Sequence, residues 1–343
     1  MIENARKYAE IYQRGGGHLY HMKNISVKDL DDFRIGQVEN EKAATGITVI
    51  ISEKGMAAGV DIRGGGPASR ECELLRPFST AEVIHALVLG GGSTFGLDAS
   101  GGVLKYLEEH KIGYDMGFTH IPQVCQSDIF DLTVGDSKTR PDKDMGYQAC
   151  INSEKQNYRD GNYGAGCGAS VGKWLGMDYC MKSGIGSAAV CIGEVKLGAV
   201  VVVNAIGDIF DPEDGKMIAG LLSEDKHSFR STEQMMYELA EPKEKGVVGN
   251  TTIGAILTNA DFNKMQLSKI ASMAHNGYAR CIRPVHTSLD GDSIYALSSC
   301  KVRADMDLIG TLAAKVMSMA IVKAVKSAGS AYGLPGSDSV ENA

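Results

Sequence analysis

The chain has 343 residues with ordinary globular composition, 43% hydrophobic and 22% charged, which is enough for one large domain. Its net charge of −7 excludes a basic nucleic-acid-binding surface, and no apolar run approaches the ~18 residues of a membrane span. The N-terminus has no apolar signal segment, and the eight cysteines and eight histidines form no C-x-x-C or zinc motif. We therefore expect a cytoplasmic protein with reduced thiols, without a metal site and without a nucleic-acid or membrane partner.

Glycine is frequent, at 42 of 343 residues, and much of it occurs in clusters. Glycine permits positive φ and close approach of the backbone to other groups. The cluster GGGSTFGLDASGG at 90–102 lacks the acidic residue ~20 positions later that marks a dinucleotide site, and it also lacks G-K-[ST]. We expect these glycines to serve tight turns and close packing rather than a phosphate site.

The first predicted elements lie before position 111. Residues 1–25 indicate a peripheral arm. Two β-rich runs at 45–51 and 57–62 flank a Glu-Lys-Gly turn and predict a hairpin. A capping-box pattern begins a predicted short helix at 79–89, and apolar residues at helical spacing predict another at 103–110.

The rest of the chain contains apolar runs typical of buried strands and segments typical of helices. Strands are expected at 185–192, 197–206, 251–257 and 293–297. Helices are expected at 217–222, 231–239, 265–282 and 306–328, and the charged stretch 211–245 predicts an exposed loop. Because strands and helices occur in groups without strict alternation, we predict a single layered α+β domain over 1–343 rather than a doubly wound fold.

The strand predicted at 251–257 begins with two threonines, directly after Gly249 and Asn250. A self-processing hydrolase needs a hydroxyl on a rigid strand, a small residue before it and a flexible approach, which the charged residues 241–245 resemble. After cleavage the new α-amino group, with a reference pKa near ~7.7–8.0, can act as the base for its own hydroxyl. Threonine is also an ordinary strand residue. The residues alone favour a plain buried strand, with a nucleophile as the alternative.

Several unusual motifs change this balance. GNTTIGAILTN at 249–259 resembles the processing site of the family that contains D-aminopeptidase, β-peptidyl aminopeptidases and the nylon-oligomer (6-aminohexanoate oligomer) endo-hydrolases. Other segments resemble further motifs of that family in the same order, namely DIRGGGP at 61–67, GGSTFGLD at 91–98, GAGCGASVGK at 164–173, VVVN at 201–204 and HTSLDGD at 286–292. The resemblance covers most of the chain.

The resemblance implies a four-layer αββα fold of the D-aminopeptidase and ornithine acetyltransferase type. It also implies self-cleavage between Asn250 and Thr251 into chains 1–250 and 251–343. Thr251 would be the nucleophile and, through its new α-amino group, the base. Asn204 would donate a side-chain N–H to the oxyanion, where one such donor is typically worth ~2.7–4 kcal/mol.

Three charged residues also match family positions. Asp290 and Asp292 would hold and polarise the nucleophile, and carboxylates so close together would titrate as a coupled pair. Lys173 would lower the pKa of nearby groups or bind the oxyanion. Without the resemblance, the two aspartates are ordinarily a solvated turn and the lysine a surface residue.

Two features depart from the peptidase members of the family. A threonine nucleophile with two aspartates is closer to the nylon-oligomer branch, because the peptidases often have serine as nucleophile and a Ser/Glu pair. Phe130 occupies a position where the family often has a tyrosine that assists the oxyanion, and a phenyl ring cannot donate a hydrogen bond. Phe130, Gly91, Ser93 and Phe95 are the candidates for a substrate pocket.

The resemblance therefore implies an amide hydrolase that acts through an acyl-enzyme on small peptides, β-peptides or 6-aminohexanoate oligomers. No cofactor is implied, and assembly as a homo-tetramer or a larger oligomer of processed molecules is expected. Two alternatives are an acetyl-transferring relative of ornithine acetyltransferase and a non-catalytic, unprocessed homologue that binds peptides.

Overall fold

Two β-sheets lie face to face at the centre of the protein and share one long strand, β3 (Thr45–Ile62). The computed structural model describes residues 21–239 and 249–340. The first sheet contains, in spatial order, β1 (Lys23–Ile25), β11 (Ile185–Ile192), β12 (Val195–Asn204), β15 (Thr251–Ala260), β17 (Ser293–Val302) and the second half of β3. The second sheet contains β2 (Arg34–Asn40), the first half of β3, β5 (Ile84–Gly90), β8 (Val124–Asp128) and β4 (Ala68–Arg70).

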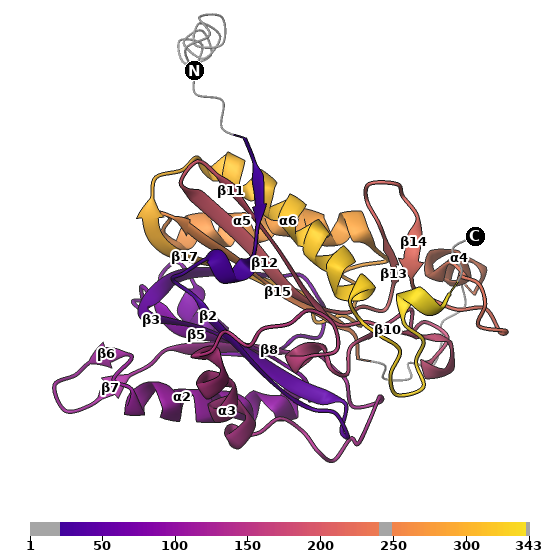
Figure 1. Cartoon of the computed structure of the whole chain (residues 1–343), viewed down its shortest axis with the longest axis horizontal. Helices are drawn as coiled ribbons and strands as arrows, with labels where there is room; N and C mark the ends of the chain where they lie inside the picture. Colours follow the sequence, from indigo (N-terminus) through magenta and orange to yellow (C-terminus); the bar gives the residue numbers. More distant parts are fainter. Residues whose placement is uncertain (1–20, 240–248, 341–343) are drawn as a thin grey trace, which may run out of the picture.

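Helices cover the outer faces of both sheets (Figure 1). The first sheet is covered by α5 (Lys264–Cys281) and α6 (Met306–Lys326), and the second by α2 (Ala99–Glu109) and α3 (Lys143–Ser153). The two long helices begin at side-chain caps that satisfy otherwise unpaired backbone N–H groups: Asn263 accepts from Gln266 N, and Asp305 accepts from Leu308 N.

Three hydrophobic clusters fill the spaces between these four layers. Strand β12 contributes to two of them, because successive side chains of a strand point to opposite faces. Val201 faces α5 and α6, whereas Val200 faces the second sheet. The third cluster joins Val49 of the second sheet to Val103 of α2. The predicted α+β class and its layered arrangement are thus confirmed.

The remaining elements are short. They are α4 (Thr232–Glu238), the pair β6 (Tyr114–Asp115) and β7 (His120–Ile121), the pair β9 (Ser170–Val171) and β10 (Met181–Lys182), and the small sheet of β13 (Asp208–Phe210), β14 (Met217–Ala219) and β16 (Ile282–Arg283). The β13–β14–β16 sheet lies beside one end of α6 (Figure 1).

Helix α6 is long and apolar enough, by length and composition, to cross a membrane. In this fold 67% of its most apolar window is buried. The buried residues pack against β11, β12 and α5. The packing of α6 against the first sheet therefore accounts for its long apolar sequence.

The predicted hairpin at 45–51 and 57–62 is wrong, because both runs belong to the single strand β3. The register of β3 against β5 shifts between Ile51 and Met56, and Gly55 in this interval has a φ of 79°. An irregularity of this kind bends a strand without reversing it. The residues expected to form a turn instead let β3 pass from one sheet to the other.

Two predicted helices are also wrong. The segment 79–89 contains all of β5 except its last residue, and every residue of β5 is buried. A short run buried on both faces lacks the alternation that distinguishes a strand from a helix. The segment 217–222 contains β14, which pairs with β13. Several residues of this segment, Leu221 among them, are buried, so the exposed loop predicted at 211–245 is wrong here. Residues 240–245 of that prediction lie outside the described residues.

Part of the predicted N-terminal arm is an edge strand. Residues Lys23–Ile25 form β1 and pair with β11, whereas 1–20 lie outside the described residues. The other predicted elements are confirmed, most of them with small changes of their bounds, although β17 is 10 residues long and ends well beyond the predicted 297. These are the helices at 103–110, 231–239, 265–282 and 306–328 and the strands at 185–192, 197–206, 251–257 and 293–297.

Candidate active site

Thr251 is the first residue of β15, a strand in the middle of the first sheet. On one side it is opposite Asn204, the last residue of β12. On the other side Asn250 forms an isolated parallel bridge with Asp290, just before β17 begins. The ends of three adjacent strands therefore bring the predicted nucleophile, the predicted oxyanion donor and the predicted aspartates together.

The peptide bond between Asn250 and Thr251 has two donors at its carbonyl oxygen. The Thr251 hydroxyl donates to the Asn250 oxygen, and the backbone N–H of Gly291 donates to the same oxygen over 2.9 Å. A Cβ on Gly291 would lie 2.8 Å from Thr251 Oγ1, so a side chain there would press on the hydroxyl. The glycine between the two aspartates thus permits a close contact of the backbone with the Asn250–Thr251 peptide bond. Sequence reasoning missed this donor.

Asp292 anchors the residue after the predicted nucleophile. Its Oδ1 accepts from the backbone N–H of Thr252 over 2.7 Å. Its Oδ2 accepts from the backbone N–H of His286 over 3.1 Å and lies 2.8 Å from His286 Nδ1. An ionised carboxylate only accepts hydrogen bonds, so Nδ1 carries the proton in this contact. The buried Asp292 carboxylate therefore has a partner on each oxygen.

Asp290 is equally buried but points to a different partner. Its Oδ2 accepts from the backbone N–H of Thr287 over 2.8 Å and from the Thr287 hydroxyl over 2.6 Å. Burial, followed by repulsion from Asp292, raises the pKa of Asp290 to about 6. The two carboxylates lie close enough to interact electrostatically, as expected, yet each is held by its own donors.

The raised pKa of Asp290 predicts a pH effect on stability. The native state holds this proton more tightly than the unfolded chain, so it binds more protons between the ordinary pKa of 3.8 and about 6. The free energy of unfolding contributed by Asp290 therefore falls as pH rises through this window. The quantity to follow is the unfolding free energy of Thr251→Ala minus that of Thr251→Ala/Asp290→Asn. We expect this difference to fall by up to about 3 kcal/mol from pH 4 to pH 7. Urea unfolding at a series of pH values measures it, and a difference independent of pH would contradict this assignment.

Lys173 and Asn204 form a buried pair. Lys173 Nζ donates to Asn204 Oδ1 over 2.9 Å and to the Asn204 carbonyl oxygen over 3.0 Å. The Asn204 amide N–H₂ then donates to the Phe130 carbonyl oxygen over 3.1 Å. Because an amide N–H₂ has two hydrogens, Asn204 retains a second donor in addition to this contact. Lys173 contacts Asn204 and thereby fixes which way the amide points, a role that differs from direct oxyanion binding.

Burial also changes the acidity of Lys173. It lowers the pKa of this lysine to about 8, against the opposing effect of Cys180, Asp290 and other nearby acidic groups. Asp131, one of those groups, is buried, accepts from Thr45 Oγ1 over 2.7 Å and from Gly92 N over 2.8 Å, and has its pKa raised to about 6 by burial. Asp131 follows Phe130 directly in the sequence, which is the signal that could have identified it.

Phe130 lies against Gly249, two residues before Thr251. A Cβ on Gly249 would lie 2.4 Å from Phe130 Cγ and 2.6 Å from Phe130 Cβ. No real Cβ tolerates such distances from a ring, so Gly249 must lack a side chain where Phe130 meets it. Phe130, one of the residues predicted to line a substrate pocket, therefore lies close to Thr251.

The other pocket candidates lie differently. A Cβ on Gly91 would lie 2.0 Å from Asp131 Oδ2, and the backbone N–H of Ser93 donates to the Ile129 carbonyl oxygen over 3.0 Å. Gly91 and Ser93 therefore pack against residues 129–131, the segment that contains Phe130. For Gly91 this agrees with the prediction that the clustered glycines serve close packing. Phe95 is 54% exposed, and the Arg140 guanidinium stacks over its ring at 3.7 Å from the ring centre. A substrate contact of these three residues stays a prediction.

The RGGGP motif packs against the segment that holds the two aspartates. Gly66 N donates to the Asp290 carbonyl oxygen over 2.8 Å, and Gly64 N donates to the Asp292 carbonyl oxygen over 3.2 Å. A Cβ on Gly64 would lie 2.2 Å from Asp292 N. Two motifs more than 200 residues apart therefore form one backbone unit next to the Asn250–Thr251 peptide bond.

His286 is a further residue that sequence reasoning did not single out, although it lies in the quoted HTSLDGD motif. Its ring contacts Asp292 on one side and packs edge-on against His275, with 4.7 Å between the ring centres. His275 Nε2 in turn lies 3.0 Å from the Asp61 carbonyl oxygen. Burial lowers the pKa of His275 to about 4, so this ring is neutral near pH 7. The pair links the aspartate to helix α5.

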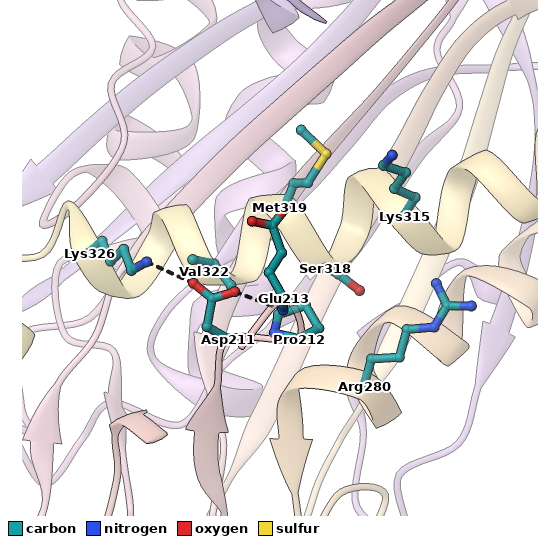
Figure 2. Close-up of a pocket in the computed structure, with 9 residues that line it drawn as sticks. All are labelled: Asp211, Pro212, Glu213, Arg280, Lys315, Ser318, Met319, Val322 and Lys326. Carbon is teal, nitrogen blue, oxygen red and sulfur yellow. Dashed lines mark hydrogen bonds and ion pairs between the residues drawn. The ribbon is translucent and has the colours of Figure 1, made fainter. Parts of the chain in front are cut away.

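A separate pocket of about 450 Å³ lies between α6, the end of α5 and the loop after β13 (Figure 2). Lys326 pairs with Asp211 across it, at 2.8 Å, and Arg280 and Lys315 line its other end. Its lining includes none of the predicted site residues. The pocket is distinct from the region around Thr251.

Comparison with known proteins assigns the chain to a family. The sequence pattern of peptidase family S58 matches residues 26–338. An uncharacterized aminopeptidase of Mycobacterium leprae is 35% identical over 316 residues, 85% of each chain. A 6-aminohexanoate-oligomer endohydrolase of Agromyces sp. is 30% identical over 315 residues, 87% of this chain and 85% of the relative.

A solved structure has the same fold. It is the structure of the L-aminopeptidase D-Ala-esterase/amidase of Ochrobactrum anthropi, which is reported as a variant of the Ntn hydrolase fold. The two structures superimpose with a TM-score of 0.66 at 16% sequence identity, over 88% of this chain and 86% of the other. The chain belongs to peptidase family S58 and is a hydrolase of peptide or other amide bonds.

Proposed function

We propose that the protein cleaves its own chain between Asn250 and Thr251 and that Thr251 then serves as the nucleophile of a mature amide hydrolase. The observation that supports this most strongly is the environment of the Asn250 carbonyl oxygen. It accepts from the Thr251 hydroxyl and, at 2.9 Å, from Gly291 N. A nucleophile next to a carbonyl that already has a backbone donor is the arrangement that acyl transfer requires.

In the processing step, Thr251 Oγ attacks the Asn250 carbonyl carbon, and the hydroxyl proton passes to the departing amide nitrogen. The C–N bond breaks, which leaves an ester between Asn250 and Thr251 Oγ and a new α-amino group on Thr251. Water then hydrolyses the ester to the Asn250 carboxylate and the free hydroxyl. The negative charge on the Asn250 oxygen in the intermediate is stabilised by the Gly291 N–H.

In the mature enzyme the Thr251 α-amino group takes the proton of its own hydroxyl as that oxygen attacks a substrate amide. Asn204 faces Thr251 across the strand pair and donates its second amide hydrogen to the substrate oxyanion, in an orientation fixed by Lys173. Asp292 holds Thr252 N and with it the strand that carries the nucleophile. The amine product leaves first, and water releases the acyl group from Thr251.

The proposed substrates are small peptides, β-peptides or linear 6-aminohexanoate oligomers, in keeping with the names of the relatives. The family match argues against the acetyl-transferring alternative, since it assigns the chain to peptidases. The non-catalytic alternative is tested by activity and by processing.

Trapping of the acyl-enzyme tests this function. Purified protein is incubated with a panel of 6-aminohexanoyl, β-aminoacyl and α-aminoacyl anilides, quenched in acid and measured by intact mass. We expect amide hydrolysis and an added mass equal to the acyl group on the fragment 251–343 only. An acyl group on the other fragment, or processed protein without activity on any of the three classes, would refute the proposal.

A further inference from the structure

The contact between Phe130 and Gly249 describes the shape of the site on the acyl side of the scissile bond. Gly249 has no room for a side chain, since its Cβ would lie 2.4 Å from Phe130 Cγ and 2.7 Å from Phe130 Cδ2. The backbone of Phe130 is anchored, because its carbonyl oxygen accepts from the Asn204 amide over 3.1 Å. The Phe130 ring forms a wall beside the chain that leads into Thr251.

The same wall faces the substrate, if the proposed function holds. Both in processing and in turnover, the acyl group is an ester of Thr251 Oγ. The segment Gly249–Asn250 is the acyl group in the first reaction, so its path marks where the acyl group of a substrate lies in the second. The chain's own sequence thus serves as a template of the acyl subsite.

We infer that Phe130 makes this subsite selective for acyl chains that are unbranched at the fifth atom. Counted from the Asn250 carbonyl carbon as the first atom, the second is the Asn250 Cα and the fifth is the Gly249 Cα. The second atom carries the buried Asn250 side chain, so the site accepts a branch there. The fifth atom lies against Phe130 and leaves no room for a branch with the configuration of an L-residue.

This selectivity identifies a class of substrate. A linear 6-aminohexanoyl group has an unsubstituted methylene at its fifth atom and passes Phe130 freely. In an α-peptide the fifth atom is the Cα of the second residue of the acyl group, which carries a side chain unless that residue is glycine. Single aminoacyl groups end before they reach the ring. The preferred long acyl groups are therefore unbranched aliphatic ω-aminoacyl chains.

Matched substrates test the inference directly. The anilides of 6-aminohexanoic acid and of its 2-methyl and 5-methyl derivatives share one leaving group. In each methyl derivative the methyl group takes the position of an L-residue's Cβ at the matching atom. We expect kcat/KM for the 5-methyl compound to be about 10–200-fold below that of the 2-methyl compound, the range for one methyl group in a pocket. Phe130→Ala is expected to reduce this ratio to within a few-fold. Phe118→Ala is the control, since Phe118 is 85% exposed, and it should leave the ratio unchanged. Equal rates on the two methyl compounds in the unaltered enzyme would overturn the inference.

Processing supplies a second test that needs no substrate. Gly249→Ala is expected to slow self-cleavage by about 10²-fold, because a displaced scissile bond loses its reactive geometry. Phe130→Ala in the same chain should restore most of the rate, whereas Phe118→Ala should not. Phe130→Leu replaces Phe130→Ala if the alanine variant does not fold by circular dichroism.

The outcomes separate this inference from the proposed function. If the unaltered chain never splits, the proposed function fails. If it splits and Gly249→Ala splits at the same rate, or if Phe130→Ala and Phe118→Ala rescue it equally, the role of Phe130 is overturned while self-processing stands.

Discussion

Thr251→Ala is expected to leave the protein as one uncut chain and to reduce amidase activity by about 10⁴-fold or more, as removal of a nucleophile does. The hydroxyl is the group that contacts the Asn250 carbonyl, and alanine has nothing to replace it. After processing the same oxygen carries the acyl group, so both reactions depend on it. A denaturing gel over several days and an anilide assay measure the two effects.

Thr252→Val is the matched control. Thr252 is the next residue of β15, so its side chain points to the opposite face of the strand. Its buried hydroxyl has no hydrogen-bond partner among residues 21–239 and 249–340, and valine has nearly the same shape. We expect this variant to split and to hydrolyse amides at the normal rate. The assignment of the two threonines would be reversed if Thr252→Val stayed uncut or if Thr251→Ala still split.

Asp292→Asn is expected to have the second largest effect, a loss of about 3 kcal/mol in unfolding free energy and about 10²-fold slower splitting. The Asp292 carboxylate accepts from Thr252 N, His286 N and His286 Nδ1. An asparagine has only one accepting oxygen, and its N–H₂ must face one of these donors. The strand start at Thr251 then loses its anchor.

Asp208→Asn separates loss of stability from loss of positioning. Asp208 is as buried as Asp292 and also accepts three hydrogen bonds, from Leu221 N, Thr232 N and the Thr232 hydroxyl. It lies in β13, and its three donors come from Leu221 and Thr232 rather than from the strand that carries Thr251. We expect a similar loss of unfolding free energy with an unchanged rate of splitting. If both variants slow splitting equally, Asp292 acts only through stability.

The sequence allowed the residues of the candidate site to be named, but not their contacts. Thr251, Asn204, Lys173, Asp290 and Asp292 could be named because each lies in a recognisable motif. That Lys173 contacts Asn204 depends on how β9 and β12 lie relative to each other, which no local pattern contains. The Gly291 donor is a backbone group, and every residue except proline has one. Only the fold determines which of them faces a reacting atom.

The errors in the fold have a similar origin. The run that became β5 is buried at every position and mostly apolar, so burial on both faces removed the periodicity that distinguishes a strand from a helix. The interval between Ile51 and Met56 has turn residues, but pairing with β17 continues the strand beyond it. In both cases partners distant in sequence decided the structure.

The ends of the two fragments test the central claim most directly. Freshly purified protein is separated under denaturing conditions, and each band is characterised by intact mass and N-terminal sequencing. The account predicts a small fragment that begins with Thr251 and a large fragment that ends at Asn250. A small fragment that begins at any other residue, or an active enzyme that remains one uncut chain, would contradict it.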